Sequence, residues 1–327
     1  MTNQPSRTAL VRDPYARWCG RRGVEKRLPI PIACGFETIE PREGFFNMPN
    51  GKVWYRIHGD GNEIPLLVIH GGPGSSSCRL ASIKALADER PVIFYDQLGS
   101  GQSDQPTDTT FWQIPRFVDE LDRVIDSLRV AEVHLLGHSW GGALAVEYFL
   151  TKQSNKLKTL ILAGPLLSTK LWIQDANFLR SQLPDSIQKV LEYHENAGSI
   201  DSEDYASATS YFYSKYMYRM QPVPDYTECD SSYFNYSIYQ QMWGPTEFYA
   251  TGNLVDFDRV DRLGEINIPV LLLVGEYDEA RPETMRRIQK LLPNAKLEII
   301  EDAGHMSMVD QPEEFNRIVR GFLNSIE

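Results

Sequence analysis

The sequence predicts an α/β protein in which helices cover both faces of a mostly parallel sheet. Two observations predict the sheet: short apolar runs recur along the chain, and helical patterns separate them. A third observation predicts an insertion, because residues 166–264 contain no such run and ten of the 16 tyrosines lie between Tyr205 and Tyr249. We therefore divide the chain into an N-terminal extension (1–42), a core (43–165 and 265–327) and a helical cap (166–264).

The elements of the first core segment follow from their apolar periodicity. Residues 52–58 alternate as a half-buried strand does, whereas residues 65–70, 91–96, 133–136 and 157–163 are apolar enough for strands buried on both faces. Helices are expected over 79–87, over 117–128, and from about 143 onwards. The helix over 117–128 has one apolar face, formed by Phe117, Leu121, Val124, Ile125 and Leu128.

The cap and the second core segment continue this pattern. Within the cap we expect helical pieces, such as residues 187–194. The alternation of strand and helix then resumes, with strands over 269–275 and 296–300 and helices over 282–291 and 313–323.

Composition excludes several classes of function. The chain has 327 residues and a net charge of −11, so nucleic acid is not an expected partner. No apolar run approaches about 18 residues, and the polar N-terminus lacks the apolar core of a signal peptide, so neither a membrane span nor export is expected. Four well-separated cysteines, Cys19, Cys34, Cys78 and Cys229, fit no zinc spacing. We interpret them as free thiols of a cytoplasmic protein.

The stretch Gly137-His138-Ser139-Trp140-Gly141 joins a buried strand to a helix. A Gly-x-Ser-x-Gly sequence in that setting is the nucleophile elbow of the α/β-hydrolase fold. Glycines without Cβ atoms permit the tight turn, which exposes the hydroxyl of Ser139 at its tip. We therefore predict that Ser139 is a nucleophile.

A serine hydroxyl needs a base to accept its proton and a carboxylate to orient that base, and in this fold the chain order is serine, acid, histidine. Asp278 follows a late predicted strand, and His305 lies on the loop after the last one. We assign Asp278 as the acid and His305 as the base, because the other histidines lie in strands, in the cap or beside the nucleophile.

Backbone N–H groups should stabilise the oxyanion of the reaction. The N–H of Trp140 follows the nucleophile, and Gly72 belongs to the loop His70-Gly-Gly-Pro-Gly74 after an earlier strand. We nominate these two as the oxyanion hole. No metal is expected, since no cluster has ligand spacing, and no nicotinamide cofactor is expected, since no G-x-G-x-x-G sequence opens a helix.

Together these motifs resemble the proline iminopeptidase family of α/β-hydrolases. The resemblance runs from about residue 44 to the C-terminus. It includes His70-Gly-Gly-Pro-Gly74, Asp96-Gln-Leu-Gly-Ser-Gly-Gln-Ser103, Gly137-His-Ser-Trp-Gly-Gly142, Trp243-Gly-Pro-Thr-Glu-Phe248, Gly275-Glu-Tyr-Asp-Glu279 and Gly304-His-Met306. It implies a serine aminopeptidase or amidase that removes an N-terminal residue, often proline, from small peptides, amides or arylamides. It also implies that Glu247 and Glu279 hold the substrate's free amino group.

The sequence departs from the family at Leu98, where many members have arginine, and in its N-terminal extension. Other readings therefore stay open. The same triad would serve an esterase, lactonase, thioesterase or amidase acting on a small molecule, and a ligand-binding protein could be built on the same scaffold. Epoxide hydrolases and dehalogenases of this fold need an aspartate where Ser139 stands. The substrate is expected to be a small molecule or short peptide, and nothing in the sequence indicates the oligomeric state.

Overall fold

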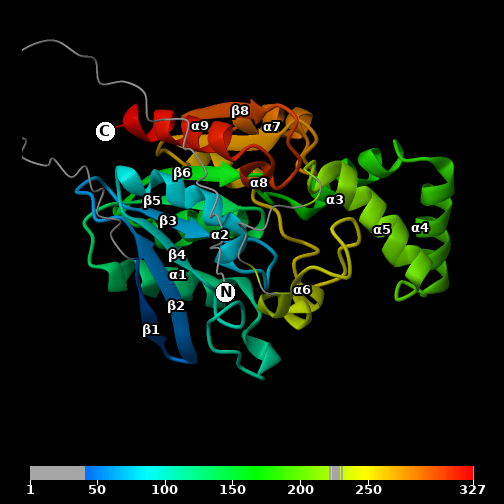
Figure 1. Cartoon of the computed structure of the whole chain (residues 1–327), viewed down its shortest axis with the longest axis horizontal. Helices are drawn as coiled ribbons and strands as arrows, with labels where there is room; N and C mark the ends of the chain where they lie inside the picture. The colour runs from blue at the N-terminus through cyan, green and yellow to red at the C-terminus, as the bar shows by residue number, and fades with distance from the viewer. Residues whose placement is uncertain (1–40, 221, 223–228, 230, 327) are drawn as a thin grey trace, which may run out of the picture. The chain divides into compact units, whose positions relative to one another are not determined.

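The computed structural model describes residues 41–220, 222, 229 and 231–326. Within them, eight strands form one sheet in the order β1-β2-β4-β3-β5-β6-β7-β8 (Figure 1). The strands are β1 (Arg42–Met48), β2 (Gly51–His58), β3 (Leu66–Ile69), β4 (Val92–Tyr95), β5 (Val133–His138), β6 (Leu157–Ala163), β7 (Val270–Gly275) and β8 (Ala295–Ile300). Pairing is antiparallel between β1 and β2 and between β2 and β4, and parallel elsewhere.

The central strands are buried on both faces, as their apolar runs predict. Every residue of β3, β4, β5 and β7 is buried. In the parallel register, Ile69 at the end of β3 lies beside Gly137 in β5, which lies beside Leu162 in β6. The loops that follow these strands therefore emerge at the same edge of the sheet, where the predicted site residues meet.

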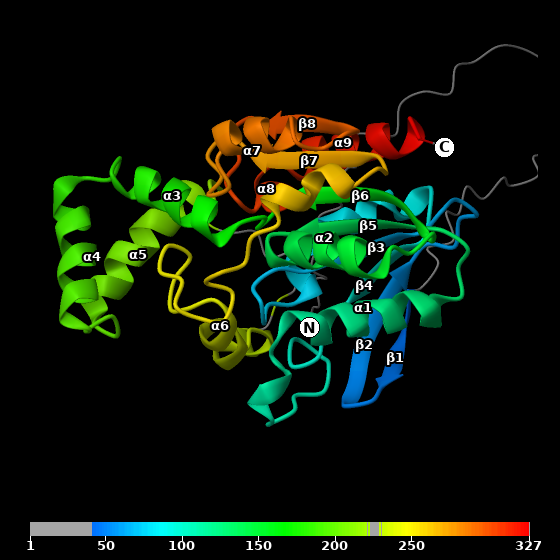
Figure 2. The same cartoon turned by 180° about the vertical axis from the view of Figure 1, so that it is seen from behind.

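Helices cover both faces of the sheet (Figures 1 and 2). One core contains side chains of α1 (Ile114–Leu128), α2 (Trp140–Lys152) and α7 (Pro282–Gln289) packed on residues such as Leu135 and Leu272. The other contains side chains of η1 (Ser77–Asp88), α8 (Ser307–Asp310) and α9 (Pro312–Asn324) packed on the alternate residues, such as Leu136 and Leu271. Successive side chains of a strand point to opposite faces of the sheet, so alternate residues belong to different cores.

Three details differ from the sequence analysis. The first is β1, which was not predicted; it is the edge strand, and half-exposed residues such as Phe45 (51% exposed) leave no clear apolar period. The second is the helix expected over 79–87, which forms over Ser77–Asp88 as a 3₁₀ helix. The third is α2, which begins at Trp140 rather than near residue 143, because the elbow turns directly into the helix.

The described part of the cap is helical. Between β6 and β7 lie α3 (Thr169–Arg180), α4 (Asp185–Ala197), α5 (Glu203–Tyr216), η4 (Ser231–Tyr233), α6 (Tyr236–Met242) and η5 (Val260–Glu265), and η2 (Thr109–Phe111) precedes α1 in the core. A small core that includes Leu191, Phe212 and Phe248 joins α3, α4 and α5, which project beyond the sheet in Figure 1. The division into core and cap stays a prediction, and residues 1–40 of the N-terminal extension lie outside the described part. No described helix has the length and apolar character needed to cross a membrane.

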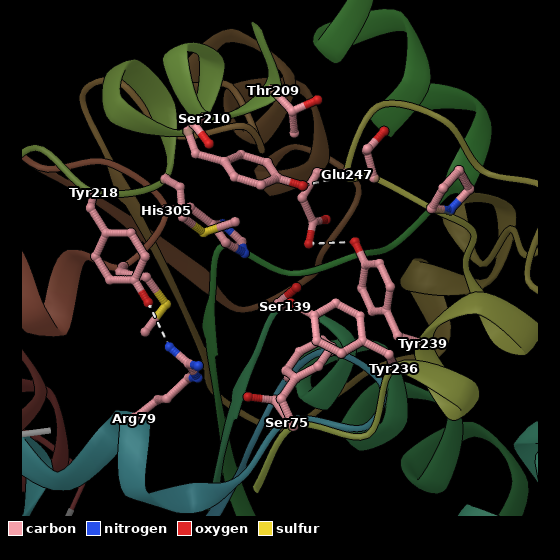
Figure 3. A pocket seen from close by; sticks show the side chains of 18 of the residues that line it. Ser75, Arg79, Ser139, Thr209, Ser210, Tyr218, Tyr236, Tyr239, Glu247 and His305 are labelled. Carbon is pink, nitrogen blue, oxygen red and sulfur yellow. Dashed lines mark hydrogen bonds between the residues drawn. The ribbon is translucent and has the colours of Figure 1, made fainter. Parts of the chain in front are cut away.

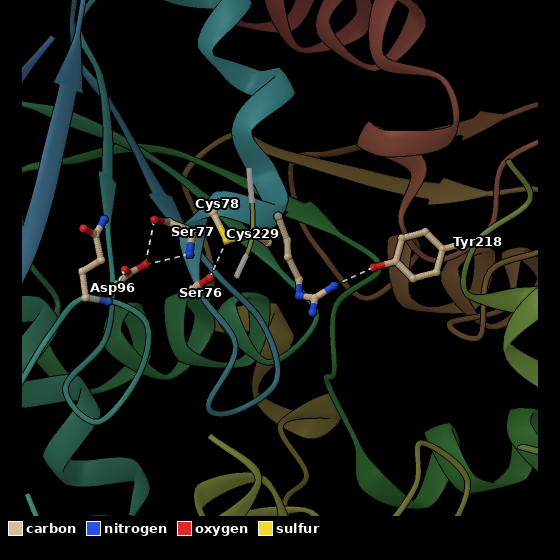
Figure 4. Close-up of a disulfide and its surroundings, with 8 residues drawn as sticks. Ser76, Ser77, Cys78, Asp96, Tyr218 and Cys229 are labelled. Carbon is tan, nitrogen blue, oxygen red and sulfur yellow. Dashed lines mark hydrogen bonds between the residues drawn. A yellow bond between two sulfur atoms is a disulfide. The ribbon is translucent and has the colours of Figure 1, made fainter. Parts of the chain in front are cut away.

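The prediction of free thiols is wrong for Cys78 and Cys229, which form a disulfide with a Cα–Cα distance of 5.5 Å (Figure 4). The two residues are 151 positions apart in the chain, so their spacing gave no indication of proximity. They meet because Cys78, in the first turn of η1, lies near the segment that leads into α6. Cys19 and Cys34 lie outside the described residues.

Candidate active site

Ser139 lies at the tip of a tight turn between β5 and α2. Its backbone has φ 56° and ψ −119°, a conformation that non-glycine residues rarely adopt. The turn is held by a 2.9 Å bond from the Ser139 N–H to the carbonyl of Ala163. A Cβ at Gly137 would lie 2.3 Å from the Gly141 carbonyl oxygen, and one at Gly141 would lie 2.2 Å from that of Ile69. The elbow therefore requires both glycines.

Asp278 and His305 meet at the carboxyl edge of the sheet. Oδ1 of Asp278 lies 2.8 Å from Nδ1 of His305, and both side chains are buried. Asp278 follows β7, and its Oδ1 also accepts a 2.8 Å bond from the N–H of Ala280. The loop of His305 is held by a 2.7 Å bond from its N–H to the carbonyl of Tyr216 in the cap.

His305 and Ser139 line the same cavity, although no hydrogen bond joins them in the described chain. In enzymes without substrate such bonds are often long and shorten only in the substrate complex. Burial alone would lower the pKa of His305, but Asp278, through its charge and its hydrogen bond, and Glu247 together raise it above the usual value.

Two other histidines lie close by with different partners. Nε2 of His138 lies 3.2 Å from the carbonyl oxygen of His305, and burial followed by the neighbouring His305 lowers the pKa of His138. Nε2 of His70 accepts a 3.0 Å bond from the N–H of Gln97, and burial lowers the pKa of His70. Both rings therefore stay neutral near pH 7 and stabilise the loops around Ser139.

The glycine loop after β3 packs against the elbow, as the oxyanion prediction requires. A Cβ at Gly71 would lie 3.0 Å from Cβ of Ser139, so glycine allows this approach. Gly72 lines the cavity and has φ +106°. Trp140 is the first residue of α2, where helix N–H groups have no intrahelical acceptor. Gly72 and Trp140 stay our predicted oxyanion hole.

Glu247 and Glu279 form a pair of carboxyl groups, and among the described residues no lysine or arginine bonds either of them. Glu247 lines the cavity, and its Oε1 accepts a 2.8 Å bond from the hydroxyl of Tyr239. Glu279 is fully buried, and neither of its carboxyl oxygens has a hydrogen-bond partner in the described chain. Burial, then Glu247 and then Asp278 raise the pKa of Glu279 well above its usual value. Burial also raises the pKa of Glu247, against the opposing effects of His305 and Tyr239.

Ser139 opens into a cavity of about 510 Å³ between the core loops and the cap (Figure 3). Core residues such as Gly72, Arg79 and His305 line one part, and cap residues such as Tyr213 and Glu247 line the other. This volume is within the range of small-molecule sites.

Residues 64–312 match the α/β hydrolase fold family. A proline iminopeptidase of Heyndrickxia coagulans is 43% identical, over 87% of this chain and 99% of that protein. The chain belongs to the proline iminopeptidase family of α/β-hydrolases. A proline iminopeptidase of Saccharolobus solfataricus is 30% identical, over 88% of this chain and 94% of that protein.

Solved structures agree with this membership. The crystal structure of VinJ has a TM-score of 0.83 and 32% identity, covering 88% of this chain and 99% of its own. That of a proline iminopeptidase from Mycobacterium smegmatis has a TM-score of 0.81 and 34% identity, covering 87% and 98%. The predicted fold and family are confirmed, and the chain is a hydrolase; the roles of individual residues stay predictions.

Sequence reasoning missed several side chains that contact the predicted site residues. Trp172 packs edge-on against the ring of His305, with centroids 5.4 Å apart, and its Nε1 donates to the carbonyl of Glu247 at 3.0 Å. Tyr239 donates to the Glu247 carboxyl group, and the hydroxyl of Tyr213 accepts from the Glu247 N–H at 3.4 Å. The only signal was the aromatic richness of the cap, which does not distinguish site residues from packing residues.

Proposed function

We propose that this hydrolase removes an N-terminal proline, or another small apolar residue, from a short peptide, amide or arylamide. The names of its relatives support the substrate class. The observation that carries the proposal is the carboxyl pair: Glu279 is buried without a hydrogen-bond partner in the described chain, near Glu247 on the wall of the cavity that contains Ser139. A cation bound there would supply the missing partner.

The charges explain why such a site would select a free amine. Two neighbouring carboxylates repel, so the raised pKa values favour a proton on at least one of them when the site is empty. A substrate ammonium would stabilise the ionised forms and replace that proton. An acylated nitrogen carries no charge and would leave the pair unsatisfied, which costs binding energy.

Acylation then uses the three predicted catalytic residues. We propose that the oxygen of Ser139 attacks the carbonyl carbon of the N-terminal residue while His305 accepts the serine proton at Nε2. Asp278, at 2.8 Å from Nδ1 of His305, would hold the ring in the required tautomer and stabilise its charged form. The N–H groups of Gly72 and Trp140 would bind the oxyanion.

Collapse of this intermediate would complete the first half of the reaction. His305 returns the proton to the leaving amine, the scissile bond breaks, and the N-terminal residue stays bound to Ser139 as an ester. Water, deprotonated by His305, then attacks the ester carbonyl, the bond to Ser139 breaks, and His305 returns the proton to the Ser139 oxygen as the free amino acid leaves. No cofactor enters these steps.

A substrate panel tests the proposal. We expect prolyl arylamide to be hydrolysed with a kcat/KM at least about 10-fold above that of its N-acetyl analogue, the scale of one hydrogen bond to a charged group. Alanyl and leucyl arylamides measure the preference for the first residue. Equal turnover of free and N-acetyl substrates, or efficient turnover of simple esters and lactones alone, would instead favour the esterase or lactonase reading.

The cytoplasmic location stays a proposal with a weakened basis. It was inferred partly from free cysteines, and disulfides such as Cys78–Cys229 persist mainly in oxidising compartments. Fractionation of producing cells, with thiol labelling before lysis, would decide between the cytoplasm and an oxidising compartment.

A further inference from the structure

Arg79 is the one arginine or lysine among the described residues that line the cavity. Its Nη1 donates a 3.2 Å bond to the hydroxyl of Tyr218, and no carboxylate pairs with it in the described chain. A guanidinium has five N–H donors, so most of those on Arg79 remain available. The reaction proposed above does not use this charge.

Figure 3 shows Arg79 and Glu247 on opposite sides of Ser139, with Tyr218 on the side of Arg79. The cavity therefore has an acidic part and a basic part, with the serine between them. A peptide with two free ends has the matching charges, an ammonium at one end and a carboxylate at the other.

The backbone around Arg79 is firmly anchored. Ser77, two residues before Arg79, donates to Oδ1 of Asp96 from both its N–H and its hydroxyl, each at 2.8 Å. The next residue, Cys78, is joined to Cys229 by the disulfide (Figure 4). Tyr218 then fixes one nitrogen of the guanidinium. Such a side chain loses little freedom when it binds a ligand, which favours recognition.

We propose that Arg79 binds the C-terminal carboxylate of a short peptide whose N-terminal amine lies at Glu247. The inference rests on the proposed function and extends it to the leaving group. Arginine can bind a carboxylate through two parallel hydrogen bonds, which are charge-assisted and directional. The cavity would then select peptides short enough for both ends to be bound at once. The fragment that leaves after cleavage would carry the new amine and the C-terminal carboxylate that Arg79 had bound.

Peptide acids and their amides provide the test. We would measure kcat/KM for Pro-Gly, Pro-Gly-Gly and their C-terminal amides, using the wild type, Arg79→Gln and Arg79→Lys. Arg123→Gln, which removes an exposed charge on α1, is the matched control. For at least one of the two peptide lengths, we expect the wild-type kcat/KM to be at least about 10-fold higher for the acid than for the amide. Arg79→Gln should reduce this acid-to-amide ratio to about 1. Arg79→Lys should give an intermediate ratio, and the control the wild-type ratio.

Because the readout is a ratio, a general disturbance of the cavity does not mimic the effect. A wild-type ratio near 1 at both lengths, or an unchanged ratio in Arg79→Gln, would overturn the proposal. Equal use of Pro-Asp-NH₂ and Pro-Gly would also overturn it, since any carboxylate would then suffice. Prolyl arylamide separates the two levels: if the wild type does not hydrolyse it, the proposed function has failed, whereas normal hydrolysis without discrimination at the C-terminus rejects only the role of Arg79.

Discussion

At the scale of single residues, the proposed chemistry depends on the serine hydroxyl that the elbow exposes. Ser139 has a positive φ, and the packing around Gly137 and Gly141 leaves no room for a Cβ atom at either position. We expect Ser139→Ala to reduce kcat by up to about 10⁶-fold, because His305 would have no nucleophile to activate. Steady-state kinetics with prolyl arylamide measures the loss, and circular dichroism checks the fold. Ser181→Ala, at an exposed serine of the cap, is the control; more than about 10% residual activity in Ser139→Ala would refute the assignment.

The acid can be tested within its own loop. Asp278 bonds His305, whereas the exposed Glu276 accepts a 3.2 Å bond from the N–H of Asp302. Asp278→Asn should reduce kcat by about 10⁴-fold, because an amide there favours the wrong histidine tautomer. Glu276→Gln should keep most of the activity. The reverse pattern in kinetic assays of the two variants would move the acid to residue 276.

The pH dependence follows from the surroundings of His305, which must be neutral to act as a base. Burial opposes its charge, but Asp278 and Glu247 prevail and raise its pKa above 6.5. Activity should therefore fall as the pH drops through this raised value, so the acidic limb of kcat/KM should have its midpoint above 6.5. Glu247→Gln removes one cause of the increase and should move the midpoint to lower pH. A midpoint below 6.5, or one that moves upward in the variant, would contradict the assignment.

At the scale of elements, the sequence predicts most clearly the strands that are buried on both faces. Strands such as β3 and β7 are buried on both faces, so every residue is apolar and the pattern is clear. The edge strand β1 is half exposed and gives no such pattern. The disulfide could not be predicted because it depends on how the cap returns to the core, which local periodicity does not encode.

The disulfide should contribute to stability, since it joins η1 to the segment before α6 across 151 positions. Such crosslinks restrict the unfolded chain, and removing one typically costs about 2–4 kcal/mol. We expect dithiothreitol to lower the free energy of unfolding in urea by about this amount. Cys78→Ser should show the same loss without reductant and no further effect of reductant. If Cys78 and Cys229 both react with a thiol reagent in the unfolded, unreduced protein, the crosslink is absent.

At the scale of the whole molecule, the site combines two parts of the chain that differ in predictability. Ser139, Asp278 and His305 follow three parallel strands of one mixed sheet, so chain order and strand ends were enough to predict that they meet. Glu247 comes from the cap, and only its family motif indicated a role. Its partners Tyr239 and Trp172 were not predicted, because their contacts depend on how the cap folds over the sheet.

The most direct test of the central claim, that the carboxyl pair selects a free amine for attack by Ser139, compares Glu247→Gln with the wild type on prolyl arylamide and its N-acetyl analogue. The control is Glu192→Gln, at an exposed glutamate of α4. For the free-amine substrate, we expect Glu247→Gln to reduce kcat/KM by an amount equivalent to about 1.5–3 kcal/mol, the scale of a hydrogen bond to a charged group. For the N-acetyl substrate, kcat/KM should change little. An equal loss on both substrates would mean that Glu247 stabilises the cap rather than binding the amine, and it would contradict the claim.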